Sequence, residues 1–404
     1  MHSDKYNFIH VALPVMAESE YFPATLACIQ KQTYKNFKVY VCVNQPESFK
    51  TNSSKVHIYQ DNQKVLHYIK NHKEFPIELI DRSSEGFGWE TEKIGVGWAR
   101  KTLMDTINEQ ANKNDLIISL DADTTFNENY FQSIINNFNA NQDAVGMSVP
   151  YYHQLTKKDE AANRAMLRYE IYMRNYAINL LRIKSPYAFT ALGSAMALPI
   201  WTYRNIRGIT PKTSGEDFYF LQKLKKYGKL LITNDEKVFP GTRFSDRVFF
   251  GTGPAMIKGN AGDWTSYPIY HYSLFDIVKK TYDLFPTLFE KDIQTPMNDF
   301  LKEQLGEKNI WHPLRKNCKD IPHFVKACHD KLDGLRILQF LKSSQEKIDK
   351  TDEECLLENL KTIFPFEKLD LSTFSFRNST IDELDQIRNF LVEKEKKLQK
   401  KFLS

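Results

Sequence analysis

Short apolar runs alternate with longer stretches of helical spacing in the first part of the chain. Apolar runs at Phe8–Leu13 and Phe37–Val43 predict two strands, and the apolar positions between them fall three or four residues apart, as in a helix. Ile77–Ile80 predicts a third strand and Trp98–Gln110 a second helix. Strand, helix, strand is a βαβ unit, which opens its ligand side at the carboxyl ends of the strands. We therefore expect an α/β fold with a parallel central sheet flanked by helices.

The stretch Leu116–Thr125, LIISLDADTT, is the most informative segment of this pattern. Its near-continuous apolar start is typical of a strand buried on both faces of a parallel sheet. In an extended chain Asp121 and Asp123 point to the same side, and Ala122 between them lets a ligand approach the backbone. Hard carboxylate oxygens at a strand end suit Mg²⁺ or Mn²⁺ shared with a phosphate. The alternative is ordinary loop chemistry, since Asp is common after strands.

The pattern continues with a helix through Tyr130 and Phe138, a strand at Val145–Tyr152 and a long helix at about 160–183. The apolar stripe of the long helix is expected in the core. Its arginines are expected on a solvated face, with a smaller chance that one reaches a phosphate; they are Arg164, Arg168, Arg174 and Arg182. His153 follows the strand, where a structural histidine is a more frequent finding than a metal or phosphate ligand.

Two later segments carry candidate chemistry. Gly193 and Ser194 lie between apolar, strand-like pieces, where glycine marks a bulge or a close approach of the backbone. Glu216 and Asp217 follow Ser214 and precede an apolar helix. Either Ser214 caps that helix and the acids favour its positive end, or a carboxylate fixed at the helix start acts as a general base. Both readings stay open at this point.

Arg243 and Arg247 are four residues apart around Asp246. The two guanidiniums could clamp a diphosphate, because arginine pairs with phosphate bidentately. A salt bridge from either arginine to Asp246 is the structural alternative. The glycine-containing loop at 86–97 fits neither G-x-G-x-x-G nor a P-loop, so on its own it is a weak indication of a phosphate site.

The pattern changes from about Asp263, after which helical patterns rich in Lys, Glu, Leu and Phe continue without a strand run. Thr380 and Glu383 have the spacing of a capping box at the start of the last helix. Its buried stripe is expected at Ile381, Leu384, Ile387 and Leu391. We expect two parts, an α/β domain at 1–262 and an α-helical carboxyl-terminal extension at 263–404.

Composition adds limits to this picture. A chain of 404 residues that is 42% hydrophobic can bury a sizeable core, and a net charge of +5 does not by itself indicate nucleic-acid binding. The five cysteines are odd in number and form no C-x-x-C pair, which indicates a reducing compartment. The amino terminus lacks the pattern of a secretory signal, and the longest apolar-leaning run is broken by glycine and proline. We expect a soluble cytoplasmic protein.

The order of the motifs resembles a family of known enzymes. The motifs are Pro14 and Glu18 after the first strand, GVGWARK at 95–101, LDAD at 120–123, GS at 193–194 and GED at 215–217. Over roughly residues 6–258 this set resembles a family 2 glycosyltransferase with the GT-A fold. The resemblance implies a Rossmann-like α/β fold with a mixed, mostly parallel central sheet flanked by helices. The stretches GEDFYFLQKL and SDRVFFGTG are similar to a bacterial subgroup of that family.

The resemblance implies an inverting, hexosyltransferase-type enzyme that moves a sugar from a nucleotide-diphosphate sugar to an acceptor hydroxyl, with Mn²⁺ or Mg²⁺ at the D-x-D. Asp123 would be the main metal ligand beside Asp121, which would also contact the donor's ribose or sugar. The other donor-binding positions would be Pro14, Glu18, Asn44, Arg100, Ala122, Arg243 and Arg247.

On the acceptor side the resemblance implies Asp217 as the base, with Glu216 contacting the acceptor or orienting that base. Gly193 and Ser194 would lie on the same side. Val43-Asn44 stands where many members have Asp-Asp, so the donor base stays open between a UDP-sugar and a GDP-sugar. The implied partners are a glycan or lipid-linked acceptor, with peripheral contact to the inner membrane face and a homo-oligomer as further options.

Two other functions compete with the transferase. Asp121-Ala-Asp123-Thr-Thr also matches the D-x-D-x-T of haloacid-dehalogenase-like phosphatases, in which Asp121 would be a covalent nucleophile. Three strand signals precede the motif here, whereas such a motif normally opens the domain. The third possibility is a non-catalytic relative that binds a glycan or another subunit through its helical part.

Overall fold

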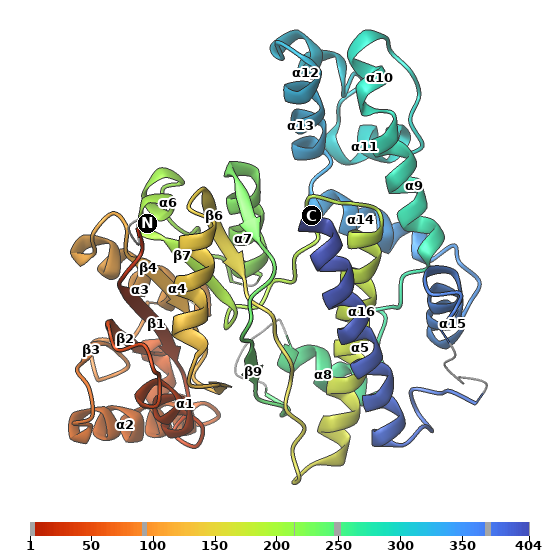
Figure 1. Cartoon of the computed structure of the whole chain (residues 1–404). Helices are drawn as coiled ribbons and strands as arrows, with labels where there is room; N and C mark the ends of the chain where they lie inside the picture. Colours follow the sequence, from red (N-terminus) through yellow and green to blue (C-terminus); the bar gives the residue numbers. More distant parts are fainter. Residues whose placement is uncertain (1–4, 91–94, 214, 246–251, 368–372, 404) are drawn as a thin grey trace. The chain divides into compact units, whose positions relative to one another are not determined.

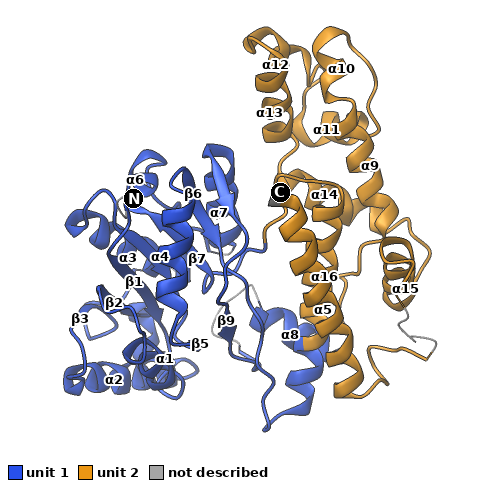
Figure 2. Cartoon of the chain, viewed as in Figure 1, with its two compact units in different colours: residues 1–166, 190–262 blue, residues 167–189, 263–404 orange. Residues whose placement is uncertain are grey.

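The computed structural model describes residues 5–90, 95–213, 215–245, 252–367 and 373–403. The chain forms two compact units, unit 1 with residues 1–166 and 190–262, and unit 2 with residues 167–189 and 263–404 (Figure 2). Ser214, Asp246 and Arg247 lie outside the described residues, so the predictions for them are not addressed below.

Unit 1 is built on a seven-stranded sheet with the strand order β3-β2-β1-β4-β7-β6-β8 (Figure 1). Its strands are β1 (Ile9–Val15), β2 (Phe37–Asn44), β3 (Ile77–Arg82), β4 (Leu116–Ser119), β6 (Ala144–Ser148), β7 (Met196–Pro199) and β8 (Lys229–Leu231). β7 is antiparallel to both neighbours, and the other neighbouring strands are parallel. A separate antiparallel ribbon joins β5 (Thr124–Phe126) to β9 (Val238–Pro240).

Helices connect and cover these strands. They are α1 (Phe22–Gln30), the 3-10 helix η1 (Glu47–Lys50), α2 (Val56–Asn71), α3 (Val96–Gln110), α4 (Tyr130–Ala140), α6 (Ile200–Asn205), α7 (Glu216–Tyr227) and α8 (Thr252–Asn260). α3 packs on β1 and β2, and α7 packs on β6 and β8. The predicted fold class is confirmed for this unit, since a mixed and mostly parallel sheet lies between helices.

The D-x-D segment differs from the extended chain that we predicted. All four residues of β4 are buried, as its apolar sequence indicates, but the strand ends at Ser119. The backbone then turns, and the Thr124 N–H donates to the Asp121 carbonyl at 3.1 Å. The turn forms because Asp tolerates turn conformations and the apolar pattern ends at Leu120. The two aspartates therefore lie on a turn between β4 and the β5–β9 ribbon.

The described residues of unit 2 form helices and connecting segments, with no strand among them. Besides residues 167–182 of α5 (Glu160–Arg182), which begins in unit 1, it contains α9 (Tyr272–Asp283), α10 (Phe285–Glu290), α11 (Asn298–Leu305), α12 (His312–Asn317), α13 (Ile321–Lys331), α14 (Gly334–Gln345), α15 (Asp352–Ile363) and α16 (Ile381–Leu403). The predicted capping box is present, since the Glu383 N–H donates to Thr380 Oγ1 at 3.2 Å and the Thr380 N–H donates to Glu383 Oε2 at 2.7 Å.

The prediction of a solvated arginine face on α5 is wrong for Arg168 and Arg174, which are 2% and 4% exposed. Arg168 pairs with Asp352, and Arg174 Nη1 lies 2.7 Å from Glu395 Oε2. The helical pattern alone does not show these carboxylates, because they lie about 180 and 220 residues further along the chain. Buried guanidiniums with such partners join this part of α5 to the rest of unit 2.

No helix within the described residues is both long enough and apolar enough to cross a bilayer.

Candidate active site

Arg100 is the centre of a polar cluster at the carboxyl end of β4. It lies on α3, is 1% exposed, and directs its guanidinium at the protein's own acceptors. Nη1 donates to Ser119 Oγ at 2.5 Å and to the Gly193 carbonyl at 2.9 Å. Nη2 donates to Asp121 Oδ1 at 3.1 Å, and Nε donates to Glu216 Oε1 at 3.3 Å. One buried arginine thus joins the D-x-D turn, the turn before β7 and the start of α7.

Glycine is required at position 193 by this arrangement. A Cβ atom there would lie 2.1 Å from Arg100 Nη2 and 2.8 Å from Arg100 Cζ. These distances are far below van der Waals contact, so any larger residue would displace the guanidinium. Of the bulge and the close approach that the sequence predicts as alternatives at Gly193, the structure contains the close approach.

Glu216 and Asp217 form the first turn of α7, after Gly215 in a left-handed conformation with φ of 67°. Burial, together with the negative charge of Asp217, raises the pKa of Glu216 from 4.5 to about 7. Burial also raises the pKa of Asp217, against the opposing charge of Arg100. Asp217 Oδ1 accepts the N–H of Phe218 at 2.7 Å. Two adjacent carboxyl groups therefore share one site, and the pKa of one lies in the physiological range.

Arg243 forms a second cluster on the other side of the D-x-D turn. Its Nη2 atom lies 2.7 Å from Glu18 Oε1 and 2.9 Å from Asp123 Oδ2. Its Cζ atom lies 4.0 Å from the ring centre of Tyr21. Although burial opposes the charge, the carboxylates of Asp123 and Glu18 raise the pKa of Arg243 above its ordinary value. Each aspartate of the turn is thus held by a different arginine.

The loop after β1 brings Glu18 into position at some cost in strain. Ala17 has a positive φ of 53°, which disfavours a residue with a side chain by roughly 1–2 kcal/mol. The Ala17 N–H donates to Asn62 Oδ1 at 2.9 Å, and the Ser19 N–H donates to Asp61 Oδ1 at 2.9 Å. α2 therefore fixes the loop in a conformation that the local sequence does not favour, as is common at functional sites.

Three residues predicted to bind the donor have other surroundings in the structure. Asn44 is 4% exposed; its Nδ2 donates to the Val15 carbonyl at 2.9 Å and its Oδ1 accepts from Trp89 Nε1 at 3.3 Å. Pro14 is buried within β1 opposite Cys42. The Arg100 guanidinium is also committed to protein acceptors. The side chains of Asn44 and Arg100 therefore support the site's framework, because their hydrogen-bonding groups are already engaged.

The structure brings together most of the other predicted residues. Asp121, Glu216 and Gly193 meet at Arg100, and Glu18 and Asp123 meet at Arg243. Ala122 and Ser194 are buried, at 1% and 3% exposure. The Ala122 carbonyl accepts from Thr25 Oγ1 at 2.8 Å, which ties α1 to the turn. His153 is 1% exposed and packs against the ring of Tyr151, as expected of a structural histidine.

Sequence reasoning missed Ser119, Tyr21 and the pairing of Glu18 with Arg243. A serine that ends an otherwise apolar buried strand is a usable indication for Ser119, because a buried hydroxyl needs a partner. No local pattern indicates the Glu18–Arg243 pair, whose members are 225 residues apart.

The chemistry of these residues suits a divalent cation. The described side chains of the two clusters comprise two guanidiniums and five carboxyl groups, which belong to Glu18, Asp121, Asp123, Glu216 and Asp217. An anionic diphosphate would meet excess negative charge here unless a cation accompanied it. Among the described residues no three His, Cys, Asp or Glu side chains form a ready metal cluster. Two aspartates suffice for Mg²⁺ or Mn²⁺ when phosphate and water supply the other ligands.

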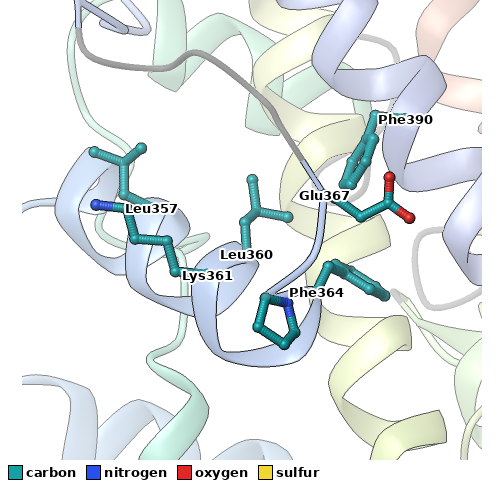
Figure 3. A pocket seen from close by; sticks show the side chains of 7 residues that line it. Leu357, Leu360, Lys361, Phe364, Glu367 and Phe390 are labelled. Atoms are coloured by element: carbon teal, nitrogen blue, oxygen red, sulfur yellow. The ribbon is translucent and has the colours of Figure 1, made fainter.

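A pocket in unit 2 offers different chemistry. It lies between α15 and α16, and Figure 3 shows Phe364 and Phe390 beside Glu367 at its wall. The carboxylate of Glu367 is paired with Lys394. The lining is mainly apolar and holds no pair of carboxylates, so the clusters of unit 1 are the better candidate for catalysis.

No protein-family profile matches the chain, and no curated protein matches it in sequence. Solved structures similar to the chain include S. aureus TarS in complex with UDP-GlcNAc, at 10% identity and a TM-score of 0.41, covering 84% of this chain and 92% of that one. A mannosyltransferase from Pyrobaculum calidifontis in complex with GDP-Man and Mn²⁺ is 13% identical with a TM-score of 0.39, covering 89% and 88% of the two chains. These likenesses are too distant to assign an activity, so we base the function on the residues of the site.

Proposed function

We propose that this chain is an inverting glycosyltransferase of family 2 with the GT-A fold, which transfers a sugar from a UDP-sugar or GDP-sugar to an acceptor hydroxyl. The observation that carries the proposal is the contact of Arg100 with both acidic motifs, since Asp121 of the D-x-D and Glu216 of the GED motif bind the same guanidinium. A transferase needs a donor-diphosphate site and a base for the acceptor at the same place, and these two motifs supply them.

Asp217 is the base in this proposal. The acceptor oxygen forms a bond to the anomeric carbon while the bond from that carbon to the diphosphate oxygen breaks, and its electron pair leaves with the nucleotide diphosphate. The acceptor proton passes to the Asp217 carboxylate. Burial raises the pKa of this carboxyl group, which makes it a better proton acceptor than an ordinary aspartate.

Arg100 acts as a positioning residue, because its donors already bind Ser119, Gly193 and the two acidic motifs. Its positive charge also limits repulsion among the neighbouring carboxylates. Asp123 and Asp121 would hold Mn²⁺ or Mg²⁺. A bound cation of this kind acts as a Lewis acid that offsets the charge developing on the leaving diphosphate.

The predicted acceptor, a glycan or a lipid-linked glycan, remains a prediction, as do a cytoplasmic location, a peripheral membrane contact and a homo-oligomer. The division into a transferase domain at 1–262 and an extension at 263–404 is also a proposal. Unit 1 ends at Gly262, in agreement with this boundary, but unit 2 also includes residues 167–189.

The test of the base is Asp217→Asn. With UDP-GlcNAc, UDP-glucose and GDP-mannose as donors and water as acceptor, release of the nucleotide diphosphate is expected to fall by about 10²–10⁴-fold while donor binding is retained. Asp235→Asn, a change at an exposed position of unit 1, is the matched control and should keep the wild-type rate.

Unchanged turnover in Asp217→Asn would contradict the assignment of Asp217 as the base. Release of free phosphate from an aryl phosphate by the wild type, lost in Asp121→Asn, would instead favour the phosphatase reading, in which Asp121 is the nucleophile.

A further inference from the structure

Arg243 supplies the positive charge beside Asp123, which is the proposed cation ligand. Arg243 Nη2 lies 2.9 Å from Asp123 Oδ2, so one oxygen of that carboxylate is already on a guanidinium. A divalent cation and Arg243 both favour this oxygen, and close approach of the two positive charges is costly. The cation and Arg243 therefore compete for Asp123.

The two carboxylates do not hold Arg243 equally. Glu18 uses both oxygens, at 2.7 and 2.8 Å from Arg243 Nη2, and its side chain is only 6% exposed. Asp123 uses one oxygen, and its side chain is 19% exposed. The ring of Tyr21 packs on the same guanidinium. Loss of the Asp123 contact would thus leave Arg243 anchored by Glu18 and Tyr21.

Arg243 also has a donor to spare. Its Nη1 atom is buried and has no hydrogen-bond partner among the described residues. The hydroxyls of Thr242 and Thr124, at or near the β5–β9 ribbon, are also buried and have no hydrogen-bond partner among the described residues. A buried donor without an acceptor costs free energy, so a ligand oxygen that reaches it is favoured. Phosphate oxygens are strong acceptors for a guanidinium, because the hydrogen bonds are charge-assisted.

We propose that Arg243 is the internal counter-ion of Asp123 in the free protein and passes to the donor's diphosphate when Asp123 accepts a divalent cation. Glu18 is the positioning residue that keeps the guanidinium at the site during this exchange. The inference rests on the proposed function, because it assumes a nucleotide-diphosphate donor. Glu18 thus holds Arg243 rather than contacting the donor directly.

The exchange makes Arg243 act oppositely on the two ligands. In the free protein Arg243 competes with the cation for Asp123, so its removal should strengthen cation binding. With nucleotide present Arg243 binds the diphosphate, so its removal should weaken nucleotide binding. A residue with a merely structural role would not change the two affinities in opposite directions.

The first experiment is calorimetric titration of Arg243→Gln. We expect Mn²⁺ alone to bind about tenfold more tightly than to the wild type, and UDP or GDP in saturating Mn²⁺ to bind about tenfold more weakly. The preference for the diphosphate over UMP or GMP should fall by a similar factor. Arg204→Gln, which removes an exposed arginine of α6 that bonds to Asn108, is the matched control and should leave these affinities unchanged.

The second experiment is Glu18→Gln, which keeps the size of the side chain and removes its charge. Arg243 then depends more on Asp123, so Mn²⁺ alone should bind more weakly than to the wild type, opposite to Arg243→Gln. Nucleotide diphosphate should also bind more weakly, since the guanidinium is less well anchored.

A cation affinity that is unchanged or lower in Arg243→Gln overturns the exchange, and so does an unchanged diphosphate preference. If this variant does not fold, Arg243→Lys replaces it. The changes in cation affinity and in diphosphate preference should then have the same directions but be smaller, because one ammonium group cannot reproduce the guanidinium's contacts. If the wild type binds neither UDP nor GDP in the presence of Mn²⁺, the proposed function itself is wrong. This result is distinguishable from failure of the Arg243 exchange alone, in which the wild type still binds a nucleotide.

Discussion

At the scale of single residues, the site depends on how two arginines are shared among five carboxyl groups. Arg100 satisfies acceptors from three segments, and Arg243 bridges Glu18 and Asp123. Removing one partner of a buried pair leaves an uncompensated charge, which is costly. Substitutions of Arg100, Arg243 or the carboxylates bonded to them should therefore change stability as well as ligand binding.

Glu216 provides a pH-dependent test at this scale. Its pKa is raised from 4.5 to about 7 by burial and by Asp217, so the folded protein holds a proton that the unfolded chain releases. The resulting stabilisation is fully present below pH ~4.5 and is lost as the pH rises through ~7. Between pH 4.5 and 8 the free energy of unfolding should fall by up to about 3 kcal/mol more in the wild type than in Glu216→Gln.

The measurement is urea unfolding across this pH range. Glu109→Gln, at an exposed position near the end of α3, should retain the wild-type pH dependence. Equal slopes for the wild type and Glu216→Gln would show that Glu216 does not take up a proton on folding in this range.

At the scale of elements, the close packing of α3 against the turn before β7 fixes the Arg100 cluster. In Gly193→Ala the new Cβ would lie 2.1 Å from Arg100 Nη2, so the side chain of Arg100 must move. We expect a loss of stability of about 1–3 kcal/mol, typical of overpacking, together with a loss of donor turnover.

A double-mutant cycle with Arg100→Ala measures this contact. The double variant should be much less destabilised than the sum of the two single variants, since the clash disappears with the guanidinium. Additive losses in thermal or urea unfolding would mean that the turn and Arg100 do not meet.

The elements themselves were largely predictable from the sequence. The buried strand at Leu116, the helix over 160–183 and the capping box at Thr380 follow from apolar spacing and local capping chemistry, and the structure confirms them. The turn at Asp121 was not predicted as such, because a strand pattern does not specify where its extension ends. The partners of Arg168 and Arg174 depend on contacts distant in sequence, which periodicity does not contain.

The site was predictable in its parts but not in its connections. Motif order indicated Asp121, Asp123, Glu216 and Asp217 as chemical groups, and the strand-like pattern around Gly193 indicated a bulge or a close approach of the backbone. Pairing of Glu18 with Arg243 across 225 residues, and the internal use of Asn44, required the fold. Local sequence reports which groups are present, whereas tertiary structure decides which of them remain for a ligand.

At the scale of the whole molecule, the two compact units are interleaved in sequence. Unit 2 takes residues 167–189 from the middle of the chain, and Arg174 of this segment pairs with Glu395 of α16. A boundary drawn only after Gly262 would separate these buried partners. Residues 167–182 of α5 are therefore an integral part of the helical unit.

The clusters in unit 1 are proposed to bind a nucleotide-diphosphate donor with a divalent cation. Calorimetric titration of UDP and GDP into the full chain, with and without Mn²⁺, measures this binding for the wild type and Asp123→Ala. We predict that one nucleotide binds in a Mn²⁺-dependent manner and that this binding is lost in the variant. No binding of either nucleotide under any condition, or equal binding by Asp123→Ala, would contradict the proposed donor site.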